Sequence, residues 1–173
     1  PMENVKIPKH EREHGKQIPV QIMRAYLSVP PQNRYDCCIW LMSYTGVRPC
    51  ELRTIRYEDG FAIVKDAKKG PNTKPTYRKI PLHPALLPYL EDLKVCISAG
   101  VGRLESAFRE KFPEGYRLYD LRHTFTSRIQ ECGANKSWVD YITAHSAAKN
   151  TTDRVYTHWS DEFQRQEMEK LHY

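Results

Sequence analysis

The spacing of apolar residues changes twice along the chain, and this change limits the folds that the sequence can adopt. Apolar residues follow helical spacing over 18–28, form a buried-helix segment at 37–44, and continue through a short helix at 50–57. Residues 61–64 and 77–80 instead have the composition of short strands, joined by a loop that contains Gly70, Pro71 and Pro75. The sequence therefore predicts a mainly α domain of the α+β class, with a small antiparallel β hairpin inserted after the third helix.

The rest of the chain returns to helical spacing, with Gly or Pro between most segments. We expect helices over 83–95, 104–111, 119–130, 136–144, 151–158 and 162–171. The polar first segment, 1–17, is predicted to be a linker or arm, and 18–159 a single domain. Residues 160–173 are expected to form a C-terminal helix or tail, which docks either on its own chain or on a neighbouring protomer.

Composition excludes several classes of protein. The 173 residues suit one domain, and no apolar run approaches the roughly 18 residues that a membrane span requires. The five cysteines are odd in number and form no C-x-x-C pair, which argues against a disulfide framework or a zinc site and favours a reducing cytoplasm. The opening Pro1-Met2 indicates a segment taken from a longer protein.

The net charge of +6 makes nucleic acid a reasonable partner, and the position of the charge is more informative than its size. Positions 65 to 79 contain six basic residues and only one acidic residue. Such a run is either a solvated loop or a surface that binds DNA. The DNA-binding interpretation rests on Lys65, Lys69, Lys74 and Arg78, together with Lys68.

The segment 118–125, LYDLRHTF, places an arginine beside a helical core face. On a helix, Leu118, Leu121 and Phe125 share one face, and Tyr119 and Arg122 share a neighbouring edge. Arg122 is therefore either a surface residue near the start of a helix or a guanidinium held beside the core.

A second arginine, Arg48, lies in TGVRPCEL, where a glycine turn opens a short helix. A helix N-terminus offers free backbone N–H groups to an anion, and an arginine adds a planar pair of donors. Two arginines from distant parts of the chain are what in-line attack on a phosphodiester requires, because the transition state concentrates negative charge on the non-bridging oxygens.

The third segment comprises His145, at the end of one predicted helix, and Tyr156, inside the next. Spacing alone does not decide whether either residue has a functional role, since His145 can be a helix C-cap and Tyr156 can be an aromatic packing residue.

Taken in order, TGVRPCEL, the basic hairpin, YDLRHTFTS, AHS and TDRVYTHW resemble the catalytic domain of the tyrosine recombinase (phage integrase) family. The resemblance covers about residues 18–159. It implies that Arg48 and Arg122 clamp the scissile phosphate and that Tyr156 is the nucleophile, forming a 3′-phosphotyrosine link. It also implies that His145 hydrogen-bonds the phosphate and positions the tyrosine.

The family also has a hairpin lysine that protonates the leaving 5′-oxygen. Lys68 matches it best here, followed by Lys69 and then Lys74.

One residue and one spacing depart from the family pattern. Tyr119 occupies the place of the usual histidine in His-x-x-Arg, and a phenol is a poor base at neutral pH, so we expect slower chemistry. Eleven positions separate His145 from Tyr156, slightly more than is common.

The resemblance implies site-specific recombination, integrating or excising DNA by metal-independent strand cleavage and rejoining without a cofactor. The partner is double-stranded DNA, on which the protein self-associates into a tetramer, with no membrane or small-molecule substrate. The resemblance also implies a cytoplasmic protein, bacterial or phage-encoded. Two alternatives remain: a catalytically weak DNA-binding relative, and DNA relaxation of the type IB topoisomerase kind.

Overall fold

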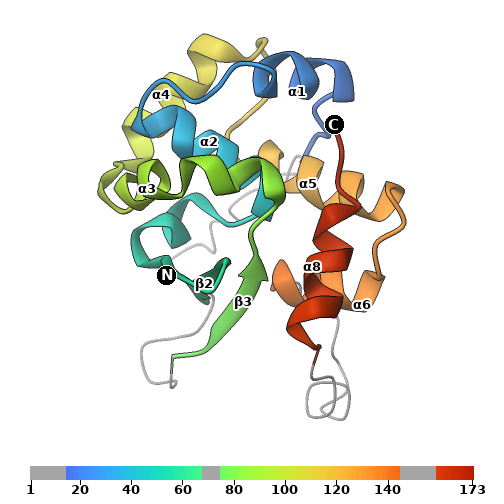
Figure 1. Ribbon diagram of the computed structural model, residues 1–173. Coiled ribbons are helices and arrows are strands. Elements are labelled where there is room, and N and C mark those ends of the chain that lie inside the picture. The colour runs from blue at the N-terminus through green and yellow to red at the C-terminus, as the bar shows by residue number, and fades with distance from the viewer. Residues whose placement is uncertain (1–14, 68–74, 145–158) are drawn as a thin grey trace, which may run out of the picture.

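A central pair of helices, α2 and α5, contacts most of the other helices, whereas the sheet packs against η1, α6 and α8 (Figure 1). The computed structural model describes residues 15–67, 75–144 and 159–173. Within these ranges the helices are α1 (Val20–Leu27), α2 (Arg34–Thr45), α3 (Leu90–Leu93), α4 (Val101–Lys111), α5 (Asp120–Glu131), α6 (Lys136–Ile142) and α8 (Asp161–Glu169). Three 3-10 helices accompany them: η1 (Pro49–Thr54), η2 (Pro84–Tyr89) and η3 (Lys94–Ser98). The predicted α+β class is confirmed.

Helix α2 is buried almost all round, as the apolar run CCIWLMSY predicts. Its first turn is capped by the Asn33 side chain, which accepts from the backbone N–H groups of Tyr35 and Asp36. From Asp36 to its end every residue is buried. The core therefore forms around α2, and the two ends of this helix face different parts of the molecule.

The sheet has three strands rather than the two that the sequence indicated. Strands β1 (Arg56–Glu58), β2 (Phe61–Lys65) and β3 (Tyr77–Pro81) are antiparallel, in the order β1-β2-β3. The predicted helix over 50–57 is therefore wrong in its second half, where the chain is already extended. The signal that identifies β1 is Asp59-Gly60, a two-residue turn in which both residues have positive φ, at 50° and 76°.

The predicted helix over 83–95 is also divided, into η2, α3 and η3. Pro88 lies within this stretch and has no backbone N–H to donate, so a continuous α-helix cannot form through it. Helix α4 begins at Val101, earlier than expected, and α6 ends at Ile142, earlier than expected. The predicted helix at 151–158 lies outside the described residues.

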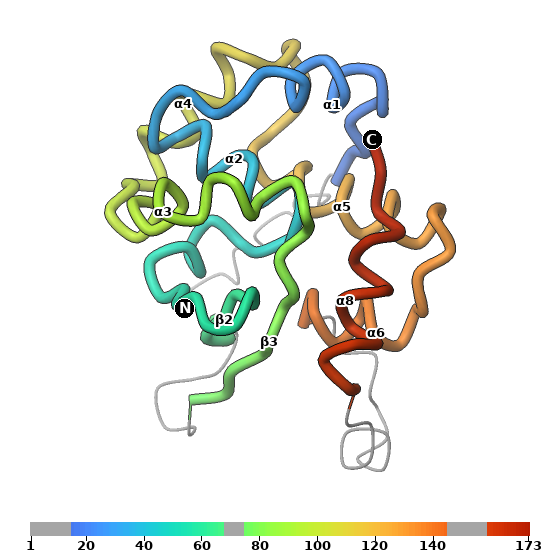
Figure 2. The backbone as a smooth tube through the Cα atoms, in the orientation of Figure 1, coloured from blue at the N-terminus to red at the C-terminus, as the bar shows by residue number. Residues whose placement is uncertain are grey.

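The C-terminal segment docks on its own chain, and exchange between protomers stays a prediction. Met168 and Leu171 are buried in the main core. The Tyr173 hydroxyl donates to the Ser43 carbonyl at 2.5 Å, and Arg24 Nε donates to the Tyr173 carbonyl at 3.0 Å. In the tube view, α8 runs beside α6 and leads the chain end back toward α1 (Figure 2).

No helix in the described ranges has both the length and the apolar character needed to cross a bilayer.

Gly46 is required where α2 meets the 3-10 helix that follows it. Its φ is 63°, in the left-handed region, and a Cβ built there would lie 2.3 Å from the Phe125 ring of α5. We expect Gly46→Ala to destabilise the fold by about 2–4 kcal/mol, because strain and overpacking add together. Urea unfolding measures this, with Gly102→Ala, where a Cβ meets nothing within 4 Å, as the control. Equal stability of the two variants would contradict the prediction.

Candidate functional site

Arg48 and Arg122 are brought together, as the sequence predicted for a phosphate clamp. Arg48 is 6% exposed and Arg122 1% exposed, so both guanidinium groups are withdrawn from bulk water. The alternative of a surface role for Arg122 is therefore wrong. Arg122 Nη1 donates to the Gly46 carbonyl at 2.5 Å, two residues before Arg48, and this bond ties α5 to the end of α2.

The two guanidinium groups influence each other electrostatically. Burial, followed by repulsion from Arg48, lowers the pKa of Arg122 to about 10, and the group remains charged at neutral pH. Arg122 Nε has no hydrogen-bond partner although it is buried. An unpaired buried N–H is costly, and an anionic acceptor would relieve both this cost and the repulsion. The arrangement is therefore suited to binding an anion.

Arg48 is held by a carboxylate that the sequence analysis did not identify. Glu51 is 1% exposed and lies on η1. Its Oε1 accepts from Arg48 Nη1 at 2.8 Å, and its Oε2 accepts from the Arg48 backbone N–H at 2.8 Å. That backbone N–H is therefore satisfied within the chain. The spacing Arg-x-x-Glu was the available signal, because residues i and i+3 face each other at a helix start.

Tyr119 lies beside Arg48, at the N-cap of α5 rather than inside the helix. Burial lowers the pKa of Arg48, but Glu51 and the hydrogen bond with the Tyr119 hydroxyl outweigh burial and leave this pKa raised. The Tyr119 side chain is 41% exposed, and its ring meets the His123 ring edge-on at 5.4 Å. Burial lowers the pKa of His123, which favours the neutral imidazole. A tyrosine hydroxyl therefore borders the arginine pair on its solvent side.

Arg78 lies elsewhere than predicted. It was expected to contact DNA, but it is 3% exposed, and its guanidinium donates to Glu51 Oε2 at 2.5 Å and to Asp66 Oδ1 at 2.6 Å. The structure therefore places it in the interior, behind Arg48. Lys65 is exposed at the end of β2, where contact with DNA stays a prediction. Five further predicted site residues lie outside the described ranges: Lys68, Lys69, Lys74, His145 and Tyr156.

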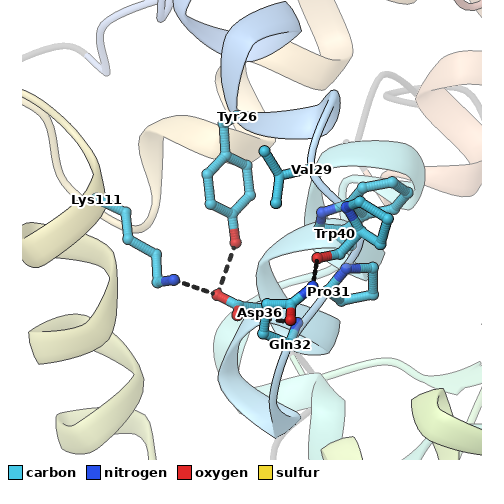
Figure 3. A pocket seen from close by; sticks show the side chains of 8 residues that line it. Tyr26, Val29, Pro31, Gln32, Asp36, Trp40 and Lys111 are labelled. Carbon is cyan, nitrogen blue, oxygen red and sulfur yellow. Dashed lines mark hydrogen bonds and ion pairs between the residues drawn. The ribbon is translucent and has the colours of Figure 1, made fainter.

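A separate pocket of about 260 Å³ lies at the N-terminal end of α2, away from the arginines at its C-terminal end (Figure 3). Asp36 is buried there and pairs with Lys111 Nζ at 2.8 Å and with the Tyr26 hydroxyl at 3.1 Å. This volume is small for a ligand site. The ion pair joins α2 to α4, and the Tyr26 hydrogen bond joins α1 to α2. Its polar groups serve the fold. Among the described residues, no group of three or more His, Cys, Asp or Glu is arranged to hold a metal ion.

Comparison with solved structures identifies the fold. The integrase from mycobacterium phage Brujita superposes with a TM-score of 0.65 at 15% identity, covering 97% of this chain and 62% of that one. The Tn1549 transposon integrase, in complex with circular intermediate DNA, gives 0.55 at 20% identity, covering 92% and 66%. A lambda integrase dimer bound to a core site gives 0.56 at 15% identity, covering 76% and 58%. No family model and no curated protein matches the sequence.

The chain thus has the fold of tyrosine recombinase catalytic domains, and the predicted resemblance is confirmed at the level of the fold. It spans about three fifths of the length of the integrase chains that it matches.

Ionised Glu51 supplies the negative charge between Arg48 and Arg78. Burial acts to raise the pKa of this carboxyl, but its bonds to Arg78 and Arg48 outweigh burial and lower it. A depressed carboxyl pKa contributes stability that is complete above the ordinary value of 4.5 and is lost as the pH falls through the folded value.

We therefore expect Glu51→Gln to cost about 3–5 kcal/mol at pH 7, because two arginines lose their counter-charge. The difference from the parent protein should narrow at pH 3, below the ordinary value of 4.5, because the unfolded parent then binds a proton more readily than the folded parent. Urea titrations at the two pH values test this, with Glu105→Gln, at an exposed position of α4, as the control. A difference that is independent of pH would contradict the ionised state of Glu51.

Proposed function

We propose that this chain is the catalytic domain of a site-specific recombinase that cuts and rejoins double-stranded DNA through a 3′-phosphotyrosine intermediate. The observation that carries the proposal is the buried pair Arg48 and Arg122, which come from distant segments and leave one buried donor without an acceptor. The fold shared with DNA-bound integrases supports DNA as the source of that anion.

In the proposed reaction the Tyr156 hydroxyl oxygen attacks the scissile phosphorus and loses its proton to water, and the bond from phosphorus to the 5′-oxygen breaks. Arg48 and Arg122 hold the non-bridging oxygens as their charge increases. The leaving 5′-oxygen takes a proton, which we assign to Lys68, with Lys69 and Lys74 as the alternatives. His145 contributes a further hydrogen bond to the phosphate. The bond energy is retained in the phosphotyrosine, so that a 5′-hydroxyl can attack it and reseal the strand.

The whole protein is proposed to act on DNA as a self-associated tetramer and to integrate or excise a mobile element. The basic residues Lys65, Lys69 and Lys74 are proposed to contact the DNA backbone near the hairpin. We propose that the reaction uses no metal ion, since the arginines and lysine supply the positive charge.

Trapping the covalent intermediate tests the proposal directly. A nick beside the scissile phosphate lets the short 5′-ended strand diffuse away, so cleavage should yield a protein–DNA adduct on a denaturing gel. We expect the full-length protein to form this adduct on DNA from the junctions of its own genetic element, and Tyr156→Phe to abolish it. Tyr141→Phe, at an exposed tyrosine of α6, is the matched control and should form the adduct normally.

An adduct that persists in Tyr156→Phe would assign the nucleophile to another tyrosine. Intact binding without an adduct from the parent protein would favour the catalytically weak relative, for which Tyr119 is the structural reason.

The identity of residue 119 is expected to limit the rate. A histidine can accept the nucleophile's proton near neutral pH, whereas the Tyr119 phenol can only hydrogen-bond. We expect Tyr119→His to raise the single-turnover rate of adduct formation by about tenfold or more, and Tyr119→Phe to lower it through loss of the bond to Arg48. Rates for the two variants that do not differ from the parent would show that residue 119 handles no proton.

A further inference from the structure

Arg78 is a third buried arginine of the cluster, and all three of its nitrogens bind the protein. Nε donates to the Ile142 carbonyl at 2.6 Å, Nη1 to Asp66 Oδ1 at 2.6 Å, and Nη2 to Glu51 Oε2 at 2.5 Å. Arg122, by contrast, keeps Nε unpartnered. Arg78 thus has no nitrogen left without a protein acceptor, whereas Arg122 has one, which separates a supporting role from a binding role.

Glu51 connects Arg78 to Arg48. One carboxylate accepts from both guanidinium groups, with Oε1 2.8 Å from Arg48 Nη1 and 3.2 Å from Arg78 Nη1. Two parallel donors from Arg78 fix the plane of the carboxylate, since such pairs are directional. The direction in which Arg48 points therefore depends on Arg78.

The C-terminus of α6 is the second structure that Arg78 holds. Three consecutive carbonyls at this end each accept from a different arginine: Ile142 from Arg78, Thr143 from Arg122, and Ala144 from Arg48. The last carbonyls of a helix lack partners within the helix and carry its negative dipole end, so guanidinium groups suit them.

Arg78 also closes the base of the hairpin. Asp66 follows β2, and its Oδ2 accepts from the Thr76 hydroxyl at 2.8 Å while its Oδ1 accepts from Arg78. Arg78 therefore joins the sheet, the 3-10 helix η1 and α6 at one point.

We propose that Arg78 is a positioning residue for strand cleavage, which fixes Glu51 and the end of α6 so that Arg48 is aimed at the scissile phosphate. The inference rests on the proposed function. Arg78 acts through Arg48 and does not itself touch DNA. Its contribution to catalysis should therefore depend on the negative charge of the phosphate that Arg48 binds.

The test compares two nicked substrates in the full-length protein. One has the ordinary scissile phosphate, and the other has a methylphosphonate there, in which a methyl group replaces one charged non-bridging oxygen. We expect Arg78→Met to cleave the phosphate substrate at least tenfold more slowly, with DNA affinity within twofold of the parent. The loss should be several-fold smaller on the methylphosphonate, because less charge has to be stabilised.

Two further comparisons separate positioning from packing. Arg78→Met combined with Arg48→Ala should be no slower than Arg48→Ala alone, because the two residues act as a unit. Lys79→Met is the matched control on the same strand, where the side chain is part exposed and pairs with Asp161 at 2.6 Å. It should leave both rates unchanged.

Arg78→Lys keeps a cation beside the two carboxylates and serves if Arg78→Met does not fold. It should also lose less of its cleavage rate on the methylphosphonate than on the phosphate, since an ammonium cannot reproduce the paired bonds. Parent-like cleavage by Arg78→Lys, equal losses on the two substrates, or fully additive losses with Arg48→Ala would each overturn the inference. Absence of cleavage by the parent protein would instead overturn the proposed function, and this inference with it.

Discussion

The carboxylate of Glu51, buried between two arginines, is the interaction on which the rest of the candidate site depends. Burying a guanidinium is unfavourable unless its charge is compensated, and Glu51 compensates Arg48 and Arg78 together. Three guanidinium groups and two carboxylates, those of Glu51 and Asp66, make up the cluster, so one positive charge remains for a ligand. In the proposed function, the affinity of Arg48 and Arg122 for phosphate therefore depends also on Glu51 and Asp66, which do not themselves touch the phosphate.

The sequence predicted the parts of this site that local patterns encode. The helical face of 118–125 predicted the core positions beside Arg122 and left open whether Arg122 itself is buried, and the glycine turn predicted that Arg48 lies at the start of a short helix. The position of Arg78 could not be predicted in the same way. A basic run looks alike whether its members face water or the interior, and only the pairing of β3 with β2 and the approach of α6 turn Arg78 inward. Strand β1 was missed because helical spacing was carried past the end of η1 to Tyr57, over residues that belong to the strand.

Tyrosine in place of histidine at position 119 affects proton transfer in the proposed reaction more than it affects the fold around the arginines. The N-cap position and the ring contact with His123 need only an aromatic residue there, whereas the bond to Arg48 needs the hydroxyl. Proton transfer needs a base as well, and a phenol does not provide one near neutral pH. In the proposed reaction, DNA binding therefore depends on the buried charges, whereas strand cleavage depends also on the side chain at position 119.

The contacts of α6 and α8 have a consequence for how the segment between them can vary in length. Before this segment, the Ala144 carbonyl accepts a hydrogen bond from Arg48. After it, α8 is bonded to the α6 region, since Glu167 accepts from the Asn135 backbone N–H and Gln164 accepts from the Trp138 side chain. Both anchors belong to one body, and lengthening a connection between fixed ends costs chain entropy only logarithmically, about 0.6 kcal/mol for each doubling. A longer or shorter connection between residues 144 and 159 would thus leave these bonds in place, because the residues that make them lie outside the connection.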